Sequence, residues 1–237
     1  MQIKILFDKM SIDKEYSIGW GFSCLIDGKI LFDTGEKASY LLHNINVMGI
    51  EKSTIESVVI SHDHWDHTGG LWEMLSNSPG LKVFSCPNFS VAFKDKVAEY
   101  KGSLIECSGL TQITDNIHCT GEIMGVYKGE KIAEQAIIVK TENGISVISG
   151  CAHPDIIKIL KNVHSNFPDE RLYMVFGGFH LKGKDTRSIQ FCVDGFRELG
   201  VIKAGPTHCS GIKAEKLFQK AYGKNFIEIK VGQLISL

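Results

Sequence analysis

The stretch "SHDHWDHTGG", from Ser61 to Gly70, holds three histidines and two aspartates within six residues. Imidazole and carboxylate groups are the ligands that zinc, iron and manganese take from proteins. His62 and His64 are two residues apart, so on an extended or looped backbone both can reach toward one point. The alternative is a solvated polar loop without a metal.

The surroundings of this stretch favour the metal site. Asp66 and His67 are adjacent, so a tight turn could direct them to a second point near the first. The stretch follows "ESVVIS", a continuously apolar run typical of a buried strand. It precedes a glycine pair and a helical pattern, and such context is what supports a motif. We therefore predict a mononuclear or dinuclear site that begins at His62.

Composition indicates a soluble globular protein. The 237 residues are 43% apolar and 22% charged, with a formal net charge of −1. The chain contains no basic block of the kind that would predict nucleic-acid binding. We also expect no signal peptide and no membrane span. Seven cysteines form no regular framework, which is typical of free thiols in a reducing cytoplasm. We expect a cytoplasmic protein with a small-molecule substrate, and the oligomeric state stays open.

Both halves of the chain run from a hairpin into alternating helices and strands. Asp27-Gly28 and Asn143-Gly144 are hairpin turn signals. The pattern predicts an α/β fold in one domain, residues 1–237, with two packed sheets and outer helices. Further histidines follow apolar runs, and sites in α/β proteins gather where strands end. These are His153, His180 and His208.

The motif resembles the signature of the metallo-β-lactamase superfamily. That signature is HxHxDH after a strand, with an earlier strand-end aspartate, here Asp33 in "LFDTG". The resemblance implies an αβ/βα four-layer sandwich across nearly the whole chain. "EQAIIV", "SGCAHP", "GGFHL" and "PTHCSG" are similar to a narrower group of metal-dependent hydrolases and dihydropteroate-synthase-like enzymes. The dihydropteroate-synthase-like enzymes resemble dihydropterin-ribofuranosylaminobenzene phosphate synthase.

The resemblance also implies roles for the candidate residues. Asp66 would additionally orient the nucleophile, and Asp33 would orient a metal-ligating histidine. His180 and His208 compete for the last ligand position. We favour His208, with His180 as proton donor or oxyanion-binding group, and the reverse assignment stays open. The implied ligands are His62, His64 and His153 for one ion, and Asp66, His67 and His208 for the other.

The sequence departs from the family pattern in its second half. Glu130 and Glu134 precede the second hairpin, where the family has a histidine, so His153 is expected to take that histidine's role. Cys151 stands where the family has a bridging aspartate. It is either a thiolate ligand or a buried thiol beside the site. We expect zinc, with iron or manganese as alternatives, and one ion or two.

The predicted function is metal-dependent hydrolysis. A metal-bound hydroxide would attack a phosphoester, a lactone or a similar small molecule. One alternative is group transfer that joins a dihydropterin to a ribosyl-aminobenzene phosphate. Another alternative, from a different class, is a redox or metal-sensing protein. Aromatic side chains such as Trp65 and Phe179 either wall a pocket for a flat substrate or belong to the core and rim.

Overall fold

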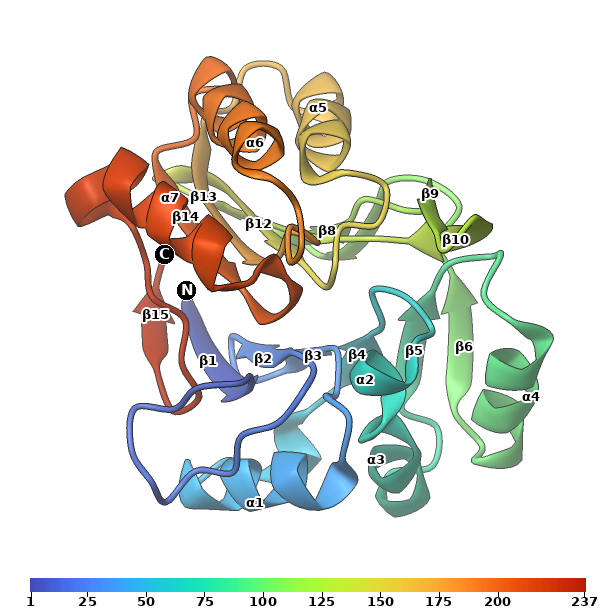
Figure 1. Cartoon of the computed structure of the whole chain (residues 1–237). Helices are drawn as coiled ribbons and strands as arrows, with labels where there is room; N and C mark the ends of the chain where they lie inside the picture. The colour runs from blue at the N-terminus through green and yellow to red at the C-terminus, as the bar shows by residue number, and fades with distance from the viewer. The chain divides into compact units, whose positions relative to one another are not determined.

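The structure is a computed structural model that describes Met1–Leu237 (Figure 1). The chain divides into two compact units. The first unit comprises Met1–Cys107 with Lys230–Leu237, and the second comprises Ser108–Ile229. Each unit contains a mixed sheet flanked by helices, which confirms the predicted α/β class. The assignment to a single domain stays a prediction.

The first unit is built on a seven-stranded sheet in the order β15-β1-β2-β3-β4-β5-β6. The strands from β15 to β3 pair antiparallel, and those from β3 to β6 pair parallel. The apolar side chains of β1 to β5 are almost fully buried, which explains the continuous apolar runs in the sequence. The strands are β1 (Gln2–Phe7), β2 (Ser23–Ile26), β3 (Ile30–Phe32), β4 (Ser57–Val59), β5 (Lys82–Ser85), β6 (Ser103–Glu106) and β15 (Leu234–Ser236).

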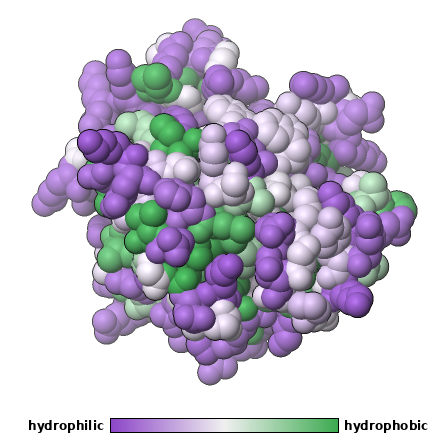
Figure 2. Space-filling view, turned by 90° about the horizontal axis from the view of Figure 1, so that it is seen from below, coloured by the Kyte–Doolittle hydropathy of each residue, from purple (hydrophilic) through white to green (hydrophobic).

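Four helices belong to this unit: α1 (Ala38–Val47), α2 (Trp65–Thr68), α3 (Leu71–Asn77) and α4 (Val91–Glu99). Helix α2 lies inside the metal-binding motif, whereas the sequence predicted a helix only after it. The Ser90 side chain accepts a hydrogen bond from the Phe93 N–H and so caps the start of α4. Figure 2 views the molecule from the side of α1 and α3 and shows hydrophilic residues around smaller apolar groups.

The second unit contains a six-stranded sheet in the order β14-β13-β12-β11-β8-β7, and a two-stranded ribbon of β9 and β10. Strands β12, β13 and β14 are parallel neighbours, so their carboxyl ends meet at one edge. The strands are β7 (Thr111–Thr114), β8 (Ile117–Cys119), β9 (Ile123–Tyr127), β10 (Glu130–Glu134), β11 (Ile137–Thr141), β12 (Gly144–Ser149), β13 (Leu172–Gly178) and β14 (Lys203–Thr207).

Helices α5 (Ile156–Asn166), α6 (Thr186–Glu198) and α7 (Ile212–Tyr222) cover this sheet (Figure 1). The apolar face of α5 predicted from the sequence is buried, and it packs into one cluster with residues of α6, α7 and the sheet. Asp155 and Asp185 cap the first turns of α5 and α6 by accepting backbone N–H groups. Burial of this cluster fixes the strand ends that carry the candidate site.

The two predicted hairpins differ in accuracy. Asp27 and Gly28 lie in a three-residue loop between β2 and β3, because Ile26 pairs with Ile30, and both have positive φ, at 51° and 72°. In the second hairpin Thr141 pairs with Gly144, so the loop is Glu142-Asn143 and not Asn143-Gly144. The turn lies one residue earlier than predicted, because Gly144 already belongs to β12. No helix of the chain is long and apolar enough to span a bilayer.

Candidate metal centre

In the first unit, the HxHxDH motif joins β4 to helix α2. His62 follows the buried end of β4, and His64 is the residue before α2. Asp66 and His67 lie in α2 and are buried, at 6% and 0% exposure. The ring centroid of His62 lies 4.7 Å from that of His64 and 4.1 Å from that of His67. The structure therefore gathers the three motif imidazoles into one group.

Asp33, at the end of β3, supports this group through hydrogen bonds. Its carboxylate accepts hydrogen bonds from the Ser61 N–H at 2.7 Å and the Ser61 hydroxyl at 2.8 Å. It also accepts the Nδ1–H of His67 at 2.6 Å. Burial raises the pKa of the Asp33 carboxyl above its usual range, and the bonds with His67 and Ser61 oppose that shift. Asp33 thus fixes the ring of His67, and the role of that histidine as a metal ligand stays a prediction.

The hydrogen bonds also fix the ring orientations. The Ser61 hydroxyl gives its proton to Asp33, so it accepts from Nδ1 of His62, at 2.8 Å. Nε2 is then the nitrogen of both His62 and His67 that would bind a metal. The Nε2 atom of His67 lies 3.6 Å from a carboxylate oxygen of Asp66. Imidazole nitrogens and one carboxylate therefore form the donor set of this unit.

In the second unit, three parallel strand ends carry the candidate residues. Cys151 and His153 follow β12, His180 follows β13, and His208 with Cys209 follows β14. A Cβ on Gly178 would lie 2.1 Å from the Gly150 carbonyl oxygen and 2.7 Å from the Cys209 sulfur. Glycine is therefore required at the end of β13, because it lets these loops approach one another closely.

Glu134, the last residue of β10, holds the loop after β12. Its buried carboxylate accepts the N–H groups of Cys151 at 2.9 Å, Ala152 at 2.6 Å and His153 at 2.8 Å. It also accepts Nδ1–H of His153 at 2.9 Å, so Nε2 is the nitrogen that would bind a metal. Burial alone would raise the pKa of the Glu134 carboxyl, but the bonds from His153 and the backbone hold it below its usual range.

Two cysteines lie among the histidines of this unit. Donor atoms of Cys151, His153 and His180 lie within 4.8 Å of one another, as do those of Cys151, His208 and Cys209. Burial raises the pKa of the Cys209 thiol, but hydrogen bonds with Cys151 and His180 bring it well below its usual range. A thiol with that preference for its anionic form is suited to bind a metal.

Several of these residues have an unusual backbone. Asp33, His180 and His208 follow strands and have φ of 52°, 51° and 47°. L-residues seldom occupy this left-handed region, and the strain clusters at functional sites. In each case the chain turns sharply at the strand end, which directs the side chain away from the sheet's continuation. His180 and His208 therefore share the same backbone feature, a positive φ at the end of a strand.

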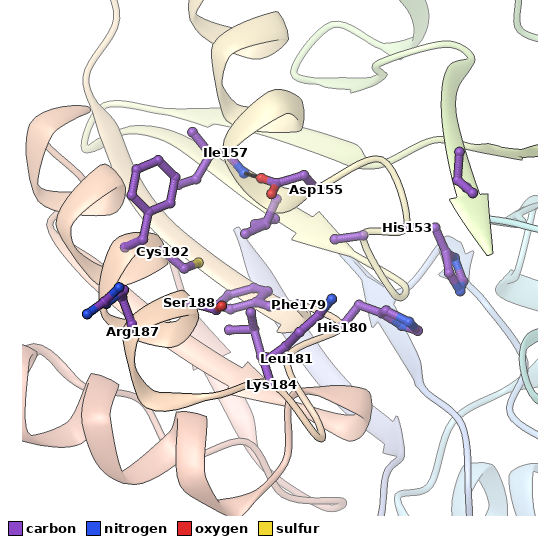
Figure 3. Close-up of a pocket in the computed structure, with 14 residues that line it drawn as sticks. His153, Asp155, Ile157, Phe179, His180, Leu181, Lys184, Arg187, Ser188 and Cys192 are labelled. Atoms are coloured by element: carbon purple, nitrogen blue, oxygen red, sulfur yellow. Dashed lines mark hydrogen bonds between the residues drawn. The ribbon is translucent and has the colours of Figure 1, made fainter. Parts of the chain in front are cut away.

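A pocket of about 600 Å³ opens beside His153 and His180 (Figure 3). It lies entirely within the second unit, between the loop after β12, the loop after β13 and helix α6. The rings of His153 and His180 are 4.6 Å apart, and Tyr127 contacts both edge to face. Phe179 lines this pocket, whereas Trp65 is 63% exposed on α2.

The structure thus places the predicted residues in two groups, one in each unit. His62, His64, Asp66 and His67 lie together with Asp33, and His153, His180 and His208 lie together with Cys151. Their division among individual ions stays a prediction. Sequence reasoning missed Glu134 as the partner of His153, and it missed Cys209. A glutamate before the apolar run "AIIV" and a cysteine beside His208 were the available signals.

The sequence of this chain is similar to those of known proteins. The family model described as "Metallo-beta-lactamase superfamily" matches residues 23–212. A Methanocaldococcus jannaschii 7,8-dihydropterin-6-methyl-4-(beta-D-ribofuranosyl)-aminobenzene-5'-phosphate synthase is 28% identical over 249 aligned residues. The alignment covers 89% of this chain and 85% of the relative. An uncharacterised protein of the same organism is 30% identical, over 99% of this chain and all of the relative.

A solved structure agrees with these matches. It is a metal-dependent hydrolase of the beta-lactamase superfamily and is 29% identical to this chain. The superposition has a TM-score of 0.84 and covers 100% of this chain and 99% of the other. The family model and the structural comparison therefore both match this chain to the beta-lactamase superfamily.

Proposed function

Because the chain belongs to the metallo-β-lactamase superfamily and has its fold, we propose that it is a metal-dependent hydrolase of a small molecule. The proposed substrate is a phosphoester, a lactone or a similar compound. The proposed ligands hold one or two divalent ions, with zinc as the expected ion. They are His62, His64, Asp66, His67, His153 and His208.

One observation carries this proposal: each unit fixes a ligand histidine with a buried carboxylate. Asp33 bonds to Nδ1 of His67 and Glu134 to Nδ1 of His153. A metal-ligating histidine normally donates its second N–H to such a partner, which fixes the tautomer and strengthens the ligand. The pattern repeated in both units supports metal binding.

The residues present fit a divalent ion chemically. Imidazole and carboxylate suit zinc, iron and manganese, and the nearby thiols of Cys151 and Cys209 favour zinc or iron. Nδ1 of His180 is buried and makes no hydrogen bond in the structure, so a polar ligand or substrate atom would satisfy it. A bound ion would lower the pKa of water and polarise the bond to be cleaved.

Two residues have proposed roles in proton transfer and positioning. Asp66 is buried beside His67 and can accept a proton, so it would orient the attacking water. His180 lies at the mouth of the pocket, and its pKa is raised, chiefly by hydrogen bonding with Cys209. A histidine beside the reacting bond can deliver a proton to a leaving group.

The test is metal content together with activity. Protein purified without added metal should contain zinc by elemental mass spectrometry and hydrolyse members of a phosphodiester and lactone panel. The double substitution His62→Ala with His64→Ala should remove the metal and lower kcat/KM by about 100-fold or more. His164→Ala, on the exposed side of α5, is the matched control and should change neither property.

The proposal is wrong if the double variant keeps full metal content and full activity. A chelator-treated sample separates loss of metal from loss of fold, because its circular dichroism spectrum should be retained while hydrolysis stops. Readdition of zinc should restore the rate.

A second candidate function is group transfer, which the synthase relative favours. In that case the protein would join a dihydropterin to a ribosyl-aminobenzene phosphate and release pyrophosphate from a dihydropterin pyrophosphate. Incubation of both substrates with the metal-loaded protein, followed by product mass analysis, tests it. Absence of both the coupled product and pyrophosphate would reject this candidate and leave the hydrolase proposal standing.

A further inference from the structure

Part of the wall of the pocket beside His153 and His180 is apolar. Ile156, Ile157 and Phe179 form part of its wall, and Phe191 of α6 lines it while 72% exposed. A large aromatic side chain left exposed beside a concave apolar surface usually marks a binding site. The volume of about 600 Å³ lies within the range of pockets that bury a small organic molecule.

Two basic side chains line the same pocket. Lys184 belongs to the loop before α6, and Arg187 lies in the first turn of that helix. Figure 3 shows His153 and His180 on one side of the pocket, Arg187 and Cys192 on the other, and Lys184 between them. Lys184 is close enough to His180 that its charge lowers the histidine's pKa, against the larger effect of Cys209.

The acidic groups near these cations are already engaged in helix capping. Asp155 lines the pocket and accepts the Ile157 N–H at 2.8 Å. Asp185, between the two cations in sequence, accepts the N–H of Ser188 at 2.8 Å and its hydroxyl at 3.1 Å. No ion pair within the second unit joins either cation to a carboxylate in the structure. Neither cation is held in a direct ion pair, so both side chains can contact an anion bound in the pocket.

We infer that this pocket binds an organic anion, with an aromatic or aliphatic body against Phe191 and Ile157 and a phosphate or carboxylate at Lys184 and Arg187. The identification of this anion as the substrate rests on the proposed function, because the reacting bond would then lie at the His153 and His180 side. Arg187 lies on the side of the pocket opposite His153 and His180 (Figure 3), so an anionic group bound there would contribute to affinity and orientation and not to bond cleavage.

The test measures binding in chelator-treated protein, so that no metal can bind the anion. Four probes are titrated by calorimetry: 1-naphthyl phosphate, 1-naphthoate, 1-naphthol and inorganic phosphate. At least one naphthyl anion should bind about tenfold more tightly than 1-naphthol or inorganic phosphate. Comparison of the two naphthyl anions identifies whether the site prefers phosphate or carboxylate.

Three variants assign the effect to named residues. Lys184→Gln with Arg187→Gln should remove the advantage of the anion over 1-naphthol, whereas Lys216→Gln, an exposed lysine of α7, should keep it. Phe191→Ala should weaken binding of all naphthyl probes. Equal affinity for 1-naphthol and the anions, or an unchanged advantage in the double variant, would overturn the inference. A failed hydrolysis test would leave these titrations unaffected, so the two proposals fail separately.

Discussion

The two units assemble histidines in different ways. The first unit takes its group from one short segment, with the Asp33 carboxylate from the end of another strand bonded to it. The second unit takes its group from three parallel strand ends and a glutamate on a separate ribbon. A local segment can be recognised in the sequence, while a dispersed group depends on strand register. The dispersed group should therefore be more sensitive to changes in its supporting contacts.

The largest effect is expected from Glu134→Ala. The substitution leaves three backbone N–H groups and the His153 ring without their buried acceptor. Loss of a buried charged partner costs about 3–5 kcal/mol. Urea unfolding should show a destabilisation in that range. Glu134→Gln, which keeps the size of the side chain, should be intermediate, and a cost below that of Asp33→Ala would reverse the comparison.

Asp33→Asn should have the next largest effect. The amide keeps the shape, but its neutral group no longer holds His67 through a charged hydrogen bond. Loss of such a partner lowers metal affinity by about 10- to 100-fold. Competition with a chromophoric chelator measures this. Asp95→Asn, on the exposed side of α4, should leave the affinity unchanged, and unchanged affinity in Asp33→Asn would show that the carboxylate is only structural.

Gly178→Ala tests the close approach of the strand ends. Its new methyl group meets the Gly150 carbonyl oxygen and the Cys209 sulfur. Overpacking of this kind costs about 1–3 kcal/mol, and thermal unfolding should show it. Gly109→Ala is the matched control, because a Cβ there has no neighbour within 4 Å. A stable Gly178→Ala variant with normal metal content would mean that the loops do not need this spacing.

The smallest effect on stability is expected from Cys151→Ser, which instead tests ligand identity. In cobalt-substituted wild-type protein, a bound thiolate gives a near-ultraviolet charge-transfer band. That band should disappear in Cys151→Ser and persist in Cys119→Ser, a buried cysteine of β8. Retention of the band in Cys151→Ser and its loss in Cys209→Ser would assign the thiolate to Cys209.

The features that could be predicted from the sequence are those that depend on residues close together in the chain. The apolar run before His62, the hairpin glycines and the amphipathic helices each contain their own signal, so the α/β fold and the motif group were foreseeable. Glu134 and Cys209 were not, because their importance arises only when β10 and three parallel strands come together. The pocket cations Lys184 and Arg187 are equally invisible, since a surface loop and a helix turn contain such residues routinely.

The ranking of His180 below His208 also came from resemblance and not from geometry. Both residues end parallel strands, both have positive φ, and each shares a group with Cys151. The structure therefore gives them similar local settings, and their separate roles stay a prediction.

The ribbon of β9 and β10 is joined to His153 at two points. Glu134 ends β10 and bonds to the histidine ring and backbone. Across the ribbon, Gly125 of β9 packs so closely that a Cβ there would lie 2.6 Å from the His153 carbonyl carbon. A displacement of this hairpin would therefore carry the imidazole with it. The position of the His153 ring is therefore set by a hairpin outside the six-stranded sheet, in addition to the strand end that carries the residue.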